Sequence, residues 1–577
     1  MRKLLRYMKP YRKECIAGPL LKLAEAVLEL LIPLLVAAII DHGLSGSDRK
    51  PYVIGLCLAM AALGLVGLAF SLTAQYFSAK AATGFAARLR GALFHHIQRL
   101  SYRTLDETST ATLITRLTGD TNQVQTGVNL ALRLLLRSPF VVFGAMFMAF
   151  TLDVQAAWIF VVIIPLLAVA VFGIMLPCIP LYKHVQKRLD TVLGRTKETL
   201  SGVRVVRAFR KEEEEIAAFQ DSNAALTGAQ LFVGRIGALL NPLTYVLING
   251  AILALLWSGA IRVQAGLLTQ GVVVALYNYM SQILVELVKL ANLIITITKA
   301  VACGKRIEAA LELPVAADAD AAPAPVPGAP RIAFSDVTLQ YHPNSRPALE
   351  GVSLSVAPGE TMGIIGGTSA GKTTLINLIP RFYDATSGQV CIDGVDVQSI
   401  PAETLRGQIG LVPQQAVLFH GTVRENLRFG CPEADDQRLW QALESAQAKD
   451  FIQQKPGGLD FVIEQGGRNL SGGQRGRLTI ARALVRQPAI LILDDSAAAL
   501  DYATEAALRQ ALSHLLWHPT ILLISQRIAT VQAADRIAVL DDGRLTGVGT
   551  HEQLLATCPE YQAIAASQKR EEVPSHA

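Results

Sequence analysis

Residues 366–373 read Gly-Gly-Thr-Ser-Ala-Gly-Lys-Thr, which fits the pattern G-x-x-x-x-G-K-[ST] of a phosphate-binding loop. The apolar run Thr361–Ile365 before it has the character of a β-strand, and Thr374–Ile379 after it reads as the start of a helix. A phosphate-binding loop requires this order of strand, loop and helix. The flanks therefore favour a nucleotide site over a chance match, and they predict an α/β domain around it.

The loop offers backbone N–H groups and a helix N-terminus, which together favour bound negative charge. Lys372 would bring a positive charge to the outer phosphates, and the Thr373 hydroxyl is placed to bind Mg²⁺. We therefore expect ATP and Mg²⁺ as cofactors. The residues of this region predicted to contact the nucleotide are Gly366, Gly367, Thr368, Ser369, Ala370, Gly371, Lys372, Thr373 and Thr374.

A second apolar run, Ala489-Ile-Leu-Ile-Leu-Asp494, ends in a carboxylate. A continuous run of this kind is typical of a parallel strand that is buried on both faces. Asp494 would then lie at the carboxyl end of the strand, where ligands collect in open α/β sheets. We predict that it holds Mg²⁺ through water. A core strand that ends in an acidic residue is the structural alternative, and the two interpretations are compatible.

The first half of the chain is composed differently. Hydrophobic residues make up 51% of the whole sequence and charged residues 17%, which is typical of a chain that is half embedded in a membrane. Spanning a bilayer takes about 20 mostly apolar residues. Six segments meet that requirement: 15–40, 53–78, 130–151, 155–180, 236–260 and 268–300. The seven cysteines include no C-x-x-C pair, so neither zinc nor a redox motif is indicated.

The connections after the second and fourth segments are long and rich in Arg and Lys. No proline interrupts residues 81–130 or 181–241, and charges recur among apolar residues at helical spacing. We therefore predict that the membrane helices continue beyond the bilayer and turn at tips near Thr108–Thr112 and Phe209–Glu213. Two ordinary loops are the alternative.

The Arg and Lys bias of these connections places them, both termini and the nucleotide domain in the cytoplasm. The net charge of +6 is accounted for by such loops, and no basic run interleaved with aromatic residues suggests a nucleic-acid partner. An Ala/Pro-rich stretch cannot bury a core and stays extended. The predicted domains are a transmembrane domain over 1–310, an Ala/Pro linker over 311–330 and a nucleotide-binding domain over 331–577.

Further motifs follow in a fixed order: Tyr341, Gly366–Thr373, Gln414, Leu470–Gln474 (Leu-Ser-Gly-Gly-Gln), Asp494, Leu500-Asp501 and Gln526. This order resembles the nucleotide domain of ATP-binding-cassette (ABC) transporters, and the six apolar segments resemble the exporter branch of that family. The resemblance covers nearly the whole chain. It implies a membrane all-α domain of six long transmembrane helices that extend into the cytoplasm. An α/β nucleotide-binding domain with antiparallel β and helical subdomains would follow.

Carried over to the matching positions, the resemblance implies that Tyr341 stacks on adenine. Gln414 would link Mg²⁺ to the membrane domain, and Asp501 would lie between two nucleotide sites. The signature residues would complete an ATP site whose phosphate-binding loop belongs to a partner chain. They are Ser471, Gly472, Gly473 and Gln474.

Two positions depart from the family pattern. After Asp494 the family usually has glutamate as the general base, whereas this chain has Asp495, whose carboxylate reaches one methylene less far. Gln526 stands in place of the family's switch histidine. It can hydrogen-bond a phosphate oxygen, but it carries no charge and takes up no proton. A misplacement of about 1 Å can cost on the order of a hundredfold in rate. Asp495, Gln526 and Gln414 are the candidate catalytic residues.

The chain therefore resembles the degenerate-site subunit of heterodimeric bacterial multidrug exporters. We expect its own site to bind ATP and hydrolyse it slowly, and its intact signature to complete a working site in a second half-transporter that supplies the glutamate and the histidine. The alternatives are a homodimeric exporter with two slow sites and a nucleotide-sensing regulatory or channel subunit. The resemblance implies a bacterial inner membrane, contact with membrane lipid, and export of hydrophobic or amphipathic drugs, lipids or peptides.

Ionisable residues also occur inside the apolar segments. Lys22, Glu25 and Glu29 share one face of the first segment, and Glu286 and Lys289 in the sixth are spaced to pair. Because intramembrane charge is costly, it normally faces a cavity or a partner helix. We predict a polar translocation cavity that favours cationic or amphipathic substrates, with helix pairing as the equal alternative. The candidate cavity residues are Glu25, Glu29, Asn278, Gln282, Glu286 and Lys289.

Overall fold

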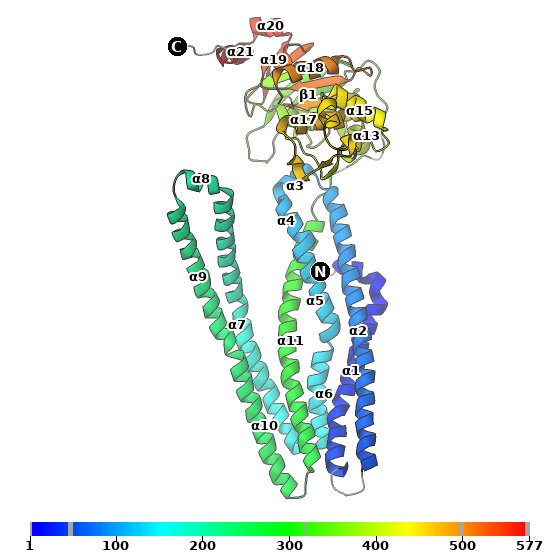
Figure 1. The fold of residues 1–577 in the computed structure, drawn as a ribbon, viewed down its shortest axis with the longest axis vertical. Coiled ribbons are helices and arrows are strands. Elements are labelled where there is room, and N and C mark those ends of the chain that lie inside the picture. The colour runs from blue at the N-terminus through cyan, green and yellow to red at the C-terminus, as the bar shows by residue number, and fades with distance from the viewer. Residues whose placement is uncertain are drawn as a thin grey trace. The chain divides into compact units, whose positions relative to one another are not determined.

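The chain forms two compact units, which Figure 1 shows as a set of long helices and a body of sheets with shorter helices. The computed structural model describes residues 3–43, 50–316, 318, 319, 321, 323–496 and 500–571. The first unit comprises Met1–Gln98 and Ser109–Leu313, and the second comprises Arg99–Thr108 and Pro314–Ala577.

Six helical stretches of the first unit are long and apolar enough to cross a membrane, as the sequence predicts. Their elements are η1 (Leu4–Tyr11), α1 (Arg12–Ala38), η2 (Ile39–Gly43), α2 (Lys50–Gln98), α4 (Thr110–Thr115), η3 (Arg116–Asp120), α5 (Thr121–Leu134), α6 (Arg137–Leu152), α7 (Val154–Ser201), α8 (Val203–Ala208), α9 (Glu212–Ala238), α10 (Leu240–Gln264) and α11 (Gln270–Leu311). α2 has 49 residues and α7 has 48, far more than the ~20 that a bilayer requires. The prediction of helices that extend beyond their apolar segments is therefore confirmed.

The two predicted tips differ in how well they match the structure. The second is close: α7 ends at Ser201, the short helix α8 follows, and Arg210 turns the chain with φ of 53° before α9. The first prediction is partly wrong. α2 already ends at Gln98, and a separate helix, α3 (Tyr102–Thr108), precedes the turn at Ser109 with φ of 58°. Because Tyr102–Thr108 is itself helical, the helical spacing of its residues gave no sign that α2 ends before it.

Helix α3 belongs to the second unit because it packs on it through aromatic contacts. The Tyr102 ring stacks on Phe382 with ring centroids 4.2 Å apart, and the Tyr383 hydroxyl donates a hydrogen bond to Asp106. Backbone pairing of Arg99 and Ala316 continues this attachment. The tip of the first long connection, Arg99–Thr108, is therefore part of the second unit.

The core of the first unit lies where α1, α6, α7, α10 and α11 pack together. Phe160 and Tyr279 are completely buried there, and the Tyr279 hydroxyl donates to the Leu30 carbonyl at 2.6 Å. Small residues let helices approach: a Cβ added at Gly127 would lie 2.2 Å from the Ala300 Cβ. Close approach of this kind is the usual way in which membrane helices pack.

The second unit is built on a six-stranded sheet with the order β12-β11-β3-β10-β9-β6. Its strands are β3 (Thr361–Gly366), β6 (Ile409–Val412), β9 (Ile490–Asp494), β10 (Thr520–Ile524), β11 (Arg536–Asp541) and β12 (Arg544–Gly549). All pairs are parallel except β11 with β12. Every residue of β9 is buried, as the continuous apolar run predicts. The carboxyl ends of β3, β10, β9 and β6 meet at one edge of the sheet.

An antiparallel sheet, β2-β1-β4-β5, and a two-stranded sheet, β7-β8, complete the unit. Their strands are β1 (Ile332–Leu339), β2 (Leu349–Val356), β4 (Ser387–Ile392), β5 (Val395–Asp396), β7 (Gly421–Thr422) and β8 (Val462–Ile463). The helices are α12 (Lys372–Leu378), η4 (Val397–Ser399), α13 (Ala402–Gly407), α14 (Val423–Arg428), α15 (Asp436–Ser445), α16 (Lys449–Gln453), η5 (Gly458–Asp460), η6 (Gln465–Gly467), α17 (Gly472–Val485), α18 (Tyr502–Ser513), α19 (Ile528–Val531), α20 (His551–Thr557) and α21 (Pro559–Glu571). The predicted α/β class with antiparallel β and helical parts is confirmed.

The Ala/Pro stretch lies against the second unit at two points. The Val326 N–H donates to the Asp393 carbonyl at 2.9 Å, and the Asp318 carboxylate accepts from the Ala402 N–H at 2.8 Å. These residues of the predicted linker are therefore hydrogen-bonded to the second unit through one backbone N–H and one side-chain carboxylate.

Candidate functional site

The candidate nucleotide residues gather at the carboxyl edge of the six-stranded sheet. β3 ends in the phosphate-binding loop, β9 ends at Asp494, and β10 leads into Ser525 and Gln526. Gln414 is exposed two residues beyond β6, whose last residue pairs with Leu493. Four strands far apart in the sequence thus bring phosphate-binding, metal-binding and catalytic candidates to one edge.

Two glycines of the loop are required by their surroundings. A Cβ added at Gly366 would lie 2.1 Å from the Leu540 carbonyl oxygen. Gly371 has φ of 96°, in the left-handed region that side chains avoid, and its Cβ would lie 2.8 Å from the Ala348 oxygen. The loop backbone can therefore fold back tightly and present its N–H groups at the start of α12.

Lys372 is the first residue of α12 and is only 8% exposed. Its ammonium group donates to the carbonyl oxygens of Gly366 at 2.9 Å and Gly367 at 2.6 Å. Burial lowers the pKa of Lys372, against the pull of the neighbouring Asp495 and Asp494 carboxylates. The loop thus holds a buried cation at the place where phosphate oxygens would be bound.

Asp494 and Thr373 form the candidate Mg²⁺ site. The Thr373 hydroxyl donates to Asp494 Oδ2 at 3.0 Å, and Asp494 is 5% exposed. Burial, with repulsion from Asp495, raises the pKa of Asp494 despite the Thr373 hydrogen bond. Two adjacent carboxylates, of which Asp494 is buried and Asp495 half-buried, and a hydroxyl are hard oxygen ligands with excess negative charge, so these residues fit a Mg²⁺ ion.

Asp495 follows the strand in an unusual backbone conformation. Its φ is 45°, a left-handed value that aspartate tolerates better than most residues. Its N–H bonds to the Ile524 carbonyl at 3.0 Å. Burial raises the pKa of Asp495, although Lys372 and Arg527 attract its charge. The backbone of Asp495 is thus held against the end of β10, which leads into Gln526.

The remaining candidates lie on the periphery of the loop. The Tyr341 hydroxyl donates to Thr374 Oγ1 at 3.1 Å, and the Tyr341 ring meets Tyr383 edge-on. Gln526 is exposed just after β10. Asp501 caps α18 by accepting from the Thr504 N–H at 2.9 Å, and this bond lowers the pKa of Asp501.

The signature opens the 14-residue helix α17 with a reciprocal cap. Ser471 Oγ accepts from the Gln474 N–H at 3.3 Å, and Gln474 Oε1 accepts from the Ser471 N–H at 3.0 Å. Ser471 and Gly472 are exposed. Within the described residues, the hydrogen bonds of Ser471 and Gln474 join these two residues to each other and not to the chain's own phosphate-binding loop.

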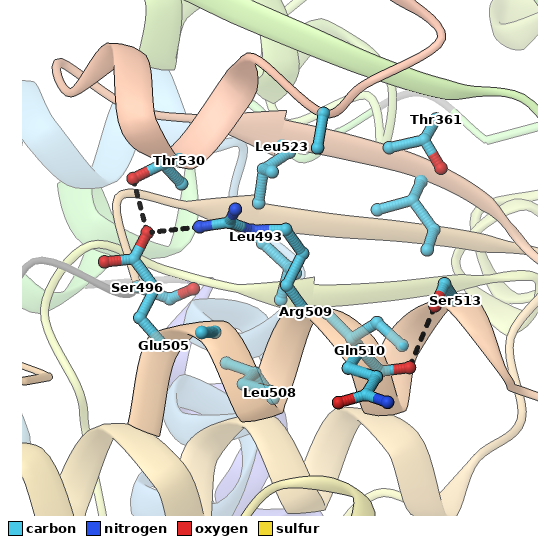
Figure 2. A pocket seen from close by; sticks show the side chains of 14 residues that line it. Thr361, Leu493, Ser496, Glu505, Leu508, Arg509, Gln510, Ser513, Leu523 and Thr530 are labelled. Atoms are coloured by element: carbon cyan, nitrogen blue, oxygen red, sulfur yellow. Dashed lines mark hydrogen bonds and ion pairs between the residues drawn. The ribbon is translucent and has the colours of Figure 1, made fainter. Parts of the chain in front are cut away.

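Sequence reasoning missed a buried carboxylate behind the catalytic edge. Figure 2 shows Glu505 of α18, which accepts a hydrogen bond from the Thr530 hydroxyl at 2.6 Å and pairs with Arg509 at 3.4 Å. These residues and Ser496 line a mostly apolar cavity of about 410 Å³. Glu505 ties α18 to α19, and no local motif marks it because its partner Thr530 is 25 positions away.

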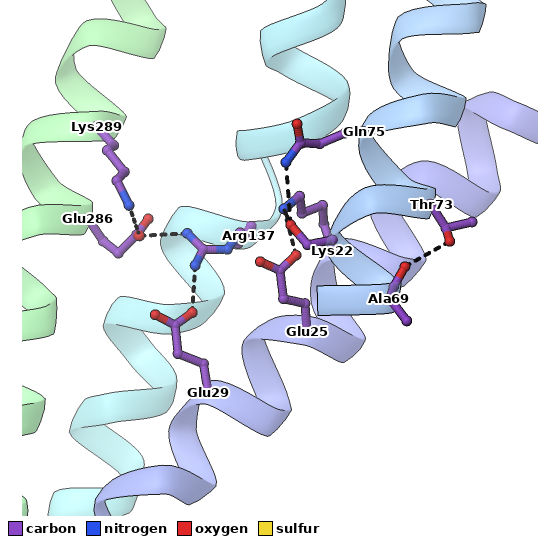
Figure 3. Close-up of polar contacts among 10 residues, drawn as sticks. Lys22, Glu25, Glu29, Ala69, Thr73, Gln75, Arg137, Glu286 and Lys289 are labelled. Carbon is purple, nitrogen blue, oxygen red and sulfur yellow. Dashed lines mark hydrogen bonds and ion pairs between the residues drawn. The ribbon is translucent and has the colours of Figure 1, made fainter. Parts of the chain in front are cut away.

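Some of the candidate residues within the membrane segments lie in one cluster of polar contacts, which Figure 3 shows. Its centre is Arg137, which the sequence interpretation missed: the guanidinium donates to Glu286 and to Glu29, each at 2.6 Å. Glu286 also accepts from Ser138 at 2.7 Å and from Lys289 at 2.8 Å, so the predicted Glu286–Lys289 pair is present. We call Glu29, Arg137, Ser138, Glu286 and Lys289 the intramembrane cluster.

The other membrane candidates lie beside this cluster. Glu25 accepts from Lys22 at 2.6 Å, and Lys22 also donates to Ser71 of α2 at 2.9 Å. Gln282 and Asn278 are half-buried on α11, about one and two turns before Glu286, and neither hydrogen-bonds to the cluster in the part of the chain that the structure describes.

Comparisons with known proteins cover both units. The family models for the ABC transporter transmembrane region and for the ABC transporter match residues 15–287 and 349–498. An ABC transporter ATP-binding protein of Mycobacterium tuberculosis (strain ATCC 25618 / H37Rv) is 37% identical over 98% of this chain and 97% of its own length. An ATP-dependent lipid A-core flippase of Syntrophus aciditrophicus (strain SB) is 34% identical over 84% of this chain and 81% of its own length.

A solved structure supports the same assignment. The structure of a bacterial Atm1-family ABC exporter with ATP bound matches with a TM-score of 0.83 and 26% sequence identity, over 96% of this chain and 99% of that one. The described residues form six helical stretches long and apolar enough to cross a membrane, together with an α/β unit that contains the phosphate-binding loop pattern, and this agrees with that structure. This chain belongs to the ABC transporter family and is an ABC exporter half-transporter with one transmembrane domain and one ATP-binding domain.

Proposed function

We propose that this chain is one half of a heterodimeric exporter, in which it contributes a slow, ATP-retaining site and an intact signature. The domains would be those predicted from the sequence, with residues 1–310 in a bacterial inner membrane and residues 331–577 in the cytoplasm. The observation that carries the proposal is the contrast within one site. The phosphate-binding loop, Lys372 and Asp494 are complete, whereas Asp495 and Gln526 lack the reach and the proton chemistry of the family residues.

The geometry of Asp495 supports a slow site. Because the left-handed backbone of Asp495 is held by the bond from its N–H to the Ile524 carbonyl, a backbone shift is not readily available to make up for the missing methylene. Gln526 would orient toward the γ-phosphate through its amide but would leave a proton transfer unassisted. Lys372, Thr373 and Gln414 would still hold ATP and its Mg²⁺.

The signature supports a partner. Ser471 and Gly472 are exposed at the N-terminus of a helix of 14 residues, and the hydrogen bonds that cap this helix end are made within the signature itself. We propose that this terminus binds the γ-phosphate of ATP held by the second half-transporter, whose glutamate and histidine would then perform hydrolysis. Asp501 would lie between the two sites.

The membrane unit offers a further surface for a partner. At the tip of the second long connection, Val205 of α8 is 61% exposed and Phe209 is 73% exposed. The nucleotide unit has an open cavity of about 340 Å³ lined by Pro380, Phe382, Phe429 and Arg486. We propose that α8 of each chain packs into this cavity of the other, so that closure of the nucleotide domains on ATP would be transmitted to the membrane helices.

The intramembrane cluster bears on the substrate. The Glu286 carboxylate accepts hydrogen bonds from three protein donors, whereas the Glu29 side chain is 37% exposed and has Arg137 as its partner. We propose that Glu29 and the neighbouring Glu25 face the transport path and favour amphipathic compounds with a cationic group. Lipids are a second candidate class, because one relative is named a lipid A-core flippase.

ATPase activity of the purified chain tests the proposal. We expect slow turnover by the isolated chain and an increase of at least about tenfold in the double variant Asp495→Glu/Gln526→His, which restores reach and proton uptake. Equal and rapid turnover of both proteins would contradict the degenerate site and, with it, the need for a second half-transporter. Absence of ATP-dependent uptake into inside-out vesicles that contain both half-transporters would favour the regulatory or channel alternative.

A further inference from the structure

The switch segment that carries Gln526 is held from the C-terminal helix. Gln568 of α21 donates through Nε2 to the Gln526 carbonyl at 2.7 Å. Its Oε1 accepts from the Ile528 N–H at 2.9 Å. One side-chain amide therefore bonds to the backbone on both sides of Arg527, in the manner of a neighbouring β-strand.

The helix that bears Gln568 is firmly anchored. Tyr561 of α21 is completely buried, and its hydroxyl hydrogen-bonds to His551 Nδ1 at 2.7 Å. Ala565 packs in the same apolar cluster as Ile528 and Val531 of the switch region. Because α21 and the switch region pack in the same apolar cluster, Gln568 has a fixed position relative to the segment that it holds.

The other side of the switch segment is held at the nucleotide edge. The Ser525 N–H donates to the Ile364 carbonyl at 3.1 Å, and Ser525 Oγ accepts from the Arg527 N–H at 3.0 Å. The backbone of the segment is thus bonded on both sides, while the Gln526 side chain remains exposed and free to reach a ligand.

We propose that Gln568 is a positioning residue, which aims Gln526 at the γ-phosphate by fixing the backbone of residues 526–528. Without it, the Gln526 carbonyl and the Ile528 N–H bond to water, and the segment samples several orientations. The γ-phosphate contact is then weakened, whereas contacts to the α- and β-phosphates, which come from the loop at Gly366–Thr373, are unaffected. The inference rests on the proposed role of Gln526 but does not require a heterodimer.

The ratio of two affinities tests this role. In the full-length chain with Mg²⁺, binding of ADP and of a hydrolysis-resistant ATP analogue with an imido β–γ bridge is measured by calorimetry. We expect Gln568→Ala to weaken the ATP analogue by about fivefold, which corresponds to the loss of one ordinary hydrogen bond, and to leave ADP within about twofold. General damage to the domain would weaken both ligands, so an equal loss for both would overturn the proposal.

Two further variants make the test specific. Gln562 lies on the same helix and donates a hydrogen bond to the Leu555 carbonyl at 2.8 Å. Gln562→Ala removes this bond, which does not involve the switch segment. We expect its affinity ratio to match the parent protein, and an equal change in this control would overturn the proposal. Gln568→Glu keeps the acceptor for Ile528 but places a carboxylate oxygen against the Gln526 carbonyl, so we expect a loss for the ATP analogue at least as large as that of Gln568→Ala, and an unchanged affinity would overturn the proposal.

A double-mutant cycle establishes that Gln568 acts through Gln526. In a Gln526→Ala background we expect Gln568→Ala to have no further effect on the affinity ratio. A full loss of about fivefold in that background would overturn the proposal. The cycle is independent of the ATPase comparison of Asp495→Glu/Gln526→His, because affinity for a non-hydrolysed analogue does not depend on whether the site is degenerate.

Discussion

Two clusters of buried charge in this molecule differ in how completely the protein compensates them. In the intramembrane cluster, Glu286 accepts from Arg137, Ser138 and Lys289. At the nucleotide edge, Asp494 and Asp495 are adjacent, and burial raises the pKa of both. A compensated cluster holds helices together, whereas an under-compensated one is prepared to bind a cation such as Mg²⁺.

Breaking the compensated cluster has the largest expected effect. Arg137→Met leaves Glu286 and Glu29 without the guanidinium that joins α1, α6 and α11. Removing one partner of a buried ion pair typically costs about 3 to 5 kcal/mol, because the other charge remains buried. We expect a large fall in the thermal unfolding midpoint of the detergent-solubilised chain.

Arg133→Met is the matched control, since Arg133 lies one turn earlier and has no ion pair among the described residues. A change of less than about 1 kcal/mol is expected there. If the two variants lost equal stability, side-chain volume and not charge compensation would explain the result.

Lys372→Met tests the cluster at the nucleotide edge, where Lys372 lies beside Asp494 and Asp495. The variant keeps the apolar stem but removes the buried ammonium that bonds to Gly366 and Gly367. A charge-assisted contact to phosphate is worth about 1.5 to 3 kcal/mol, so we expect ATP affinity to fall by roughly 10- to 100-fold. Calorimetry of ATP binding measures it, with Lys449→Met, whose partner is Glu444 on the surface, as the control. Retained ATP affinity would show that loop N–H groups alone bind the phosphates.

The two clusters also differ in how far sequence reasoning could find them. Lys372, Thr373 and Asp494 were predictable, because a loop spacing and a buried strand determine their places. Arg137 was not, because its partners Glu29 and Glu286 are 108 and 149 positions away and no helical stripe includes it. The same limit applies to Gln568, which is 42 positions from Gln526. Local periodicity indicates on which face of a helix or strand a residue lies, but it does not indicate which distant element packs against that face.

Asp494→Asn sharpens the comparison by removing an uncompensated charge. Because the pKa of Asp494 is raised in the folded protein, the folded state binds more protons than the unfolded one between the ordinary and the raised pKa. Stability of the nucleotide-free protein therefore falls as pH rises through that interval and stays lower above it. The amide oxygen of the variant can still accept from the Thr373 hydroxyl, so we expect a gain on the order of 1 kcal/mol at neutral pH and a weaker pH dependence.

The measurement is thermal unfolding of the nucleotide-free protein across pH, with and without Mg²⁺. We expect Mg²⁺ to stabilise the parent protein but not the variant. A variant that is less stable than the parent at neutral pH would show that Lys372 already neutralises Asp494, and the contrast between the two clusters would disappear.

Lys289→Met has the smallest expected effect and separates two roles within the intramembrane cluster. The Lys289 side chain is 43% exposed, while that of Glu286 is 4% exposed. Without Lys289, the Glu286 carboxylate keeps Arg137 and Ser138 as donors, and the charge that is lost belongs to a partly exposed ammonium group. We expect a loss of about 0.5 kcal/mol or less in the unfolding measurement. A loss as large as that of Arg137→Met would mean that compensation depends on the whole cluster and not on the guanidinium. Unchanged stability with altered export of cationic compounds would instead place the ammonium group beside the transport path, where it would screen Glu286 from the substrate.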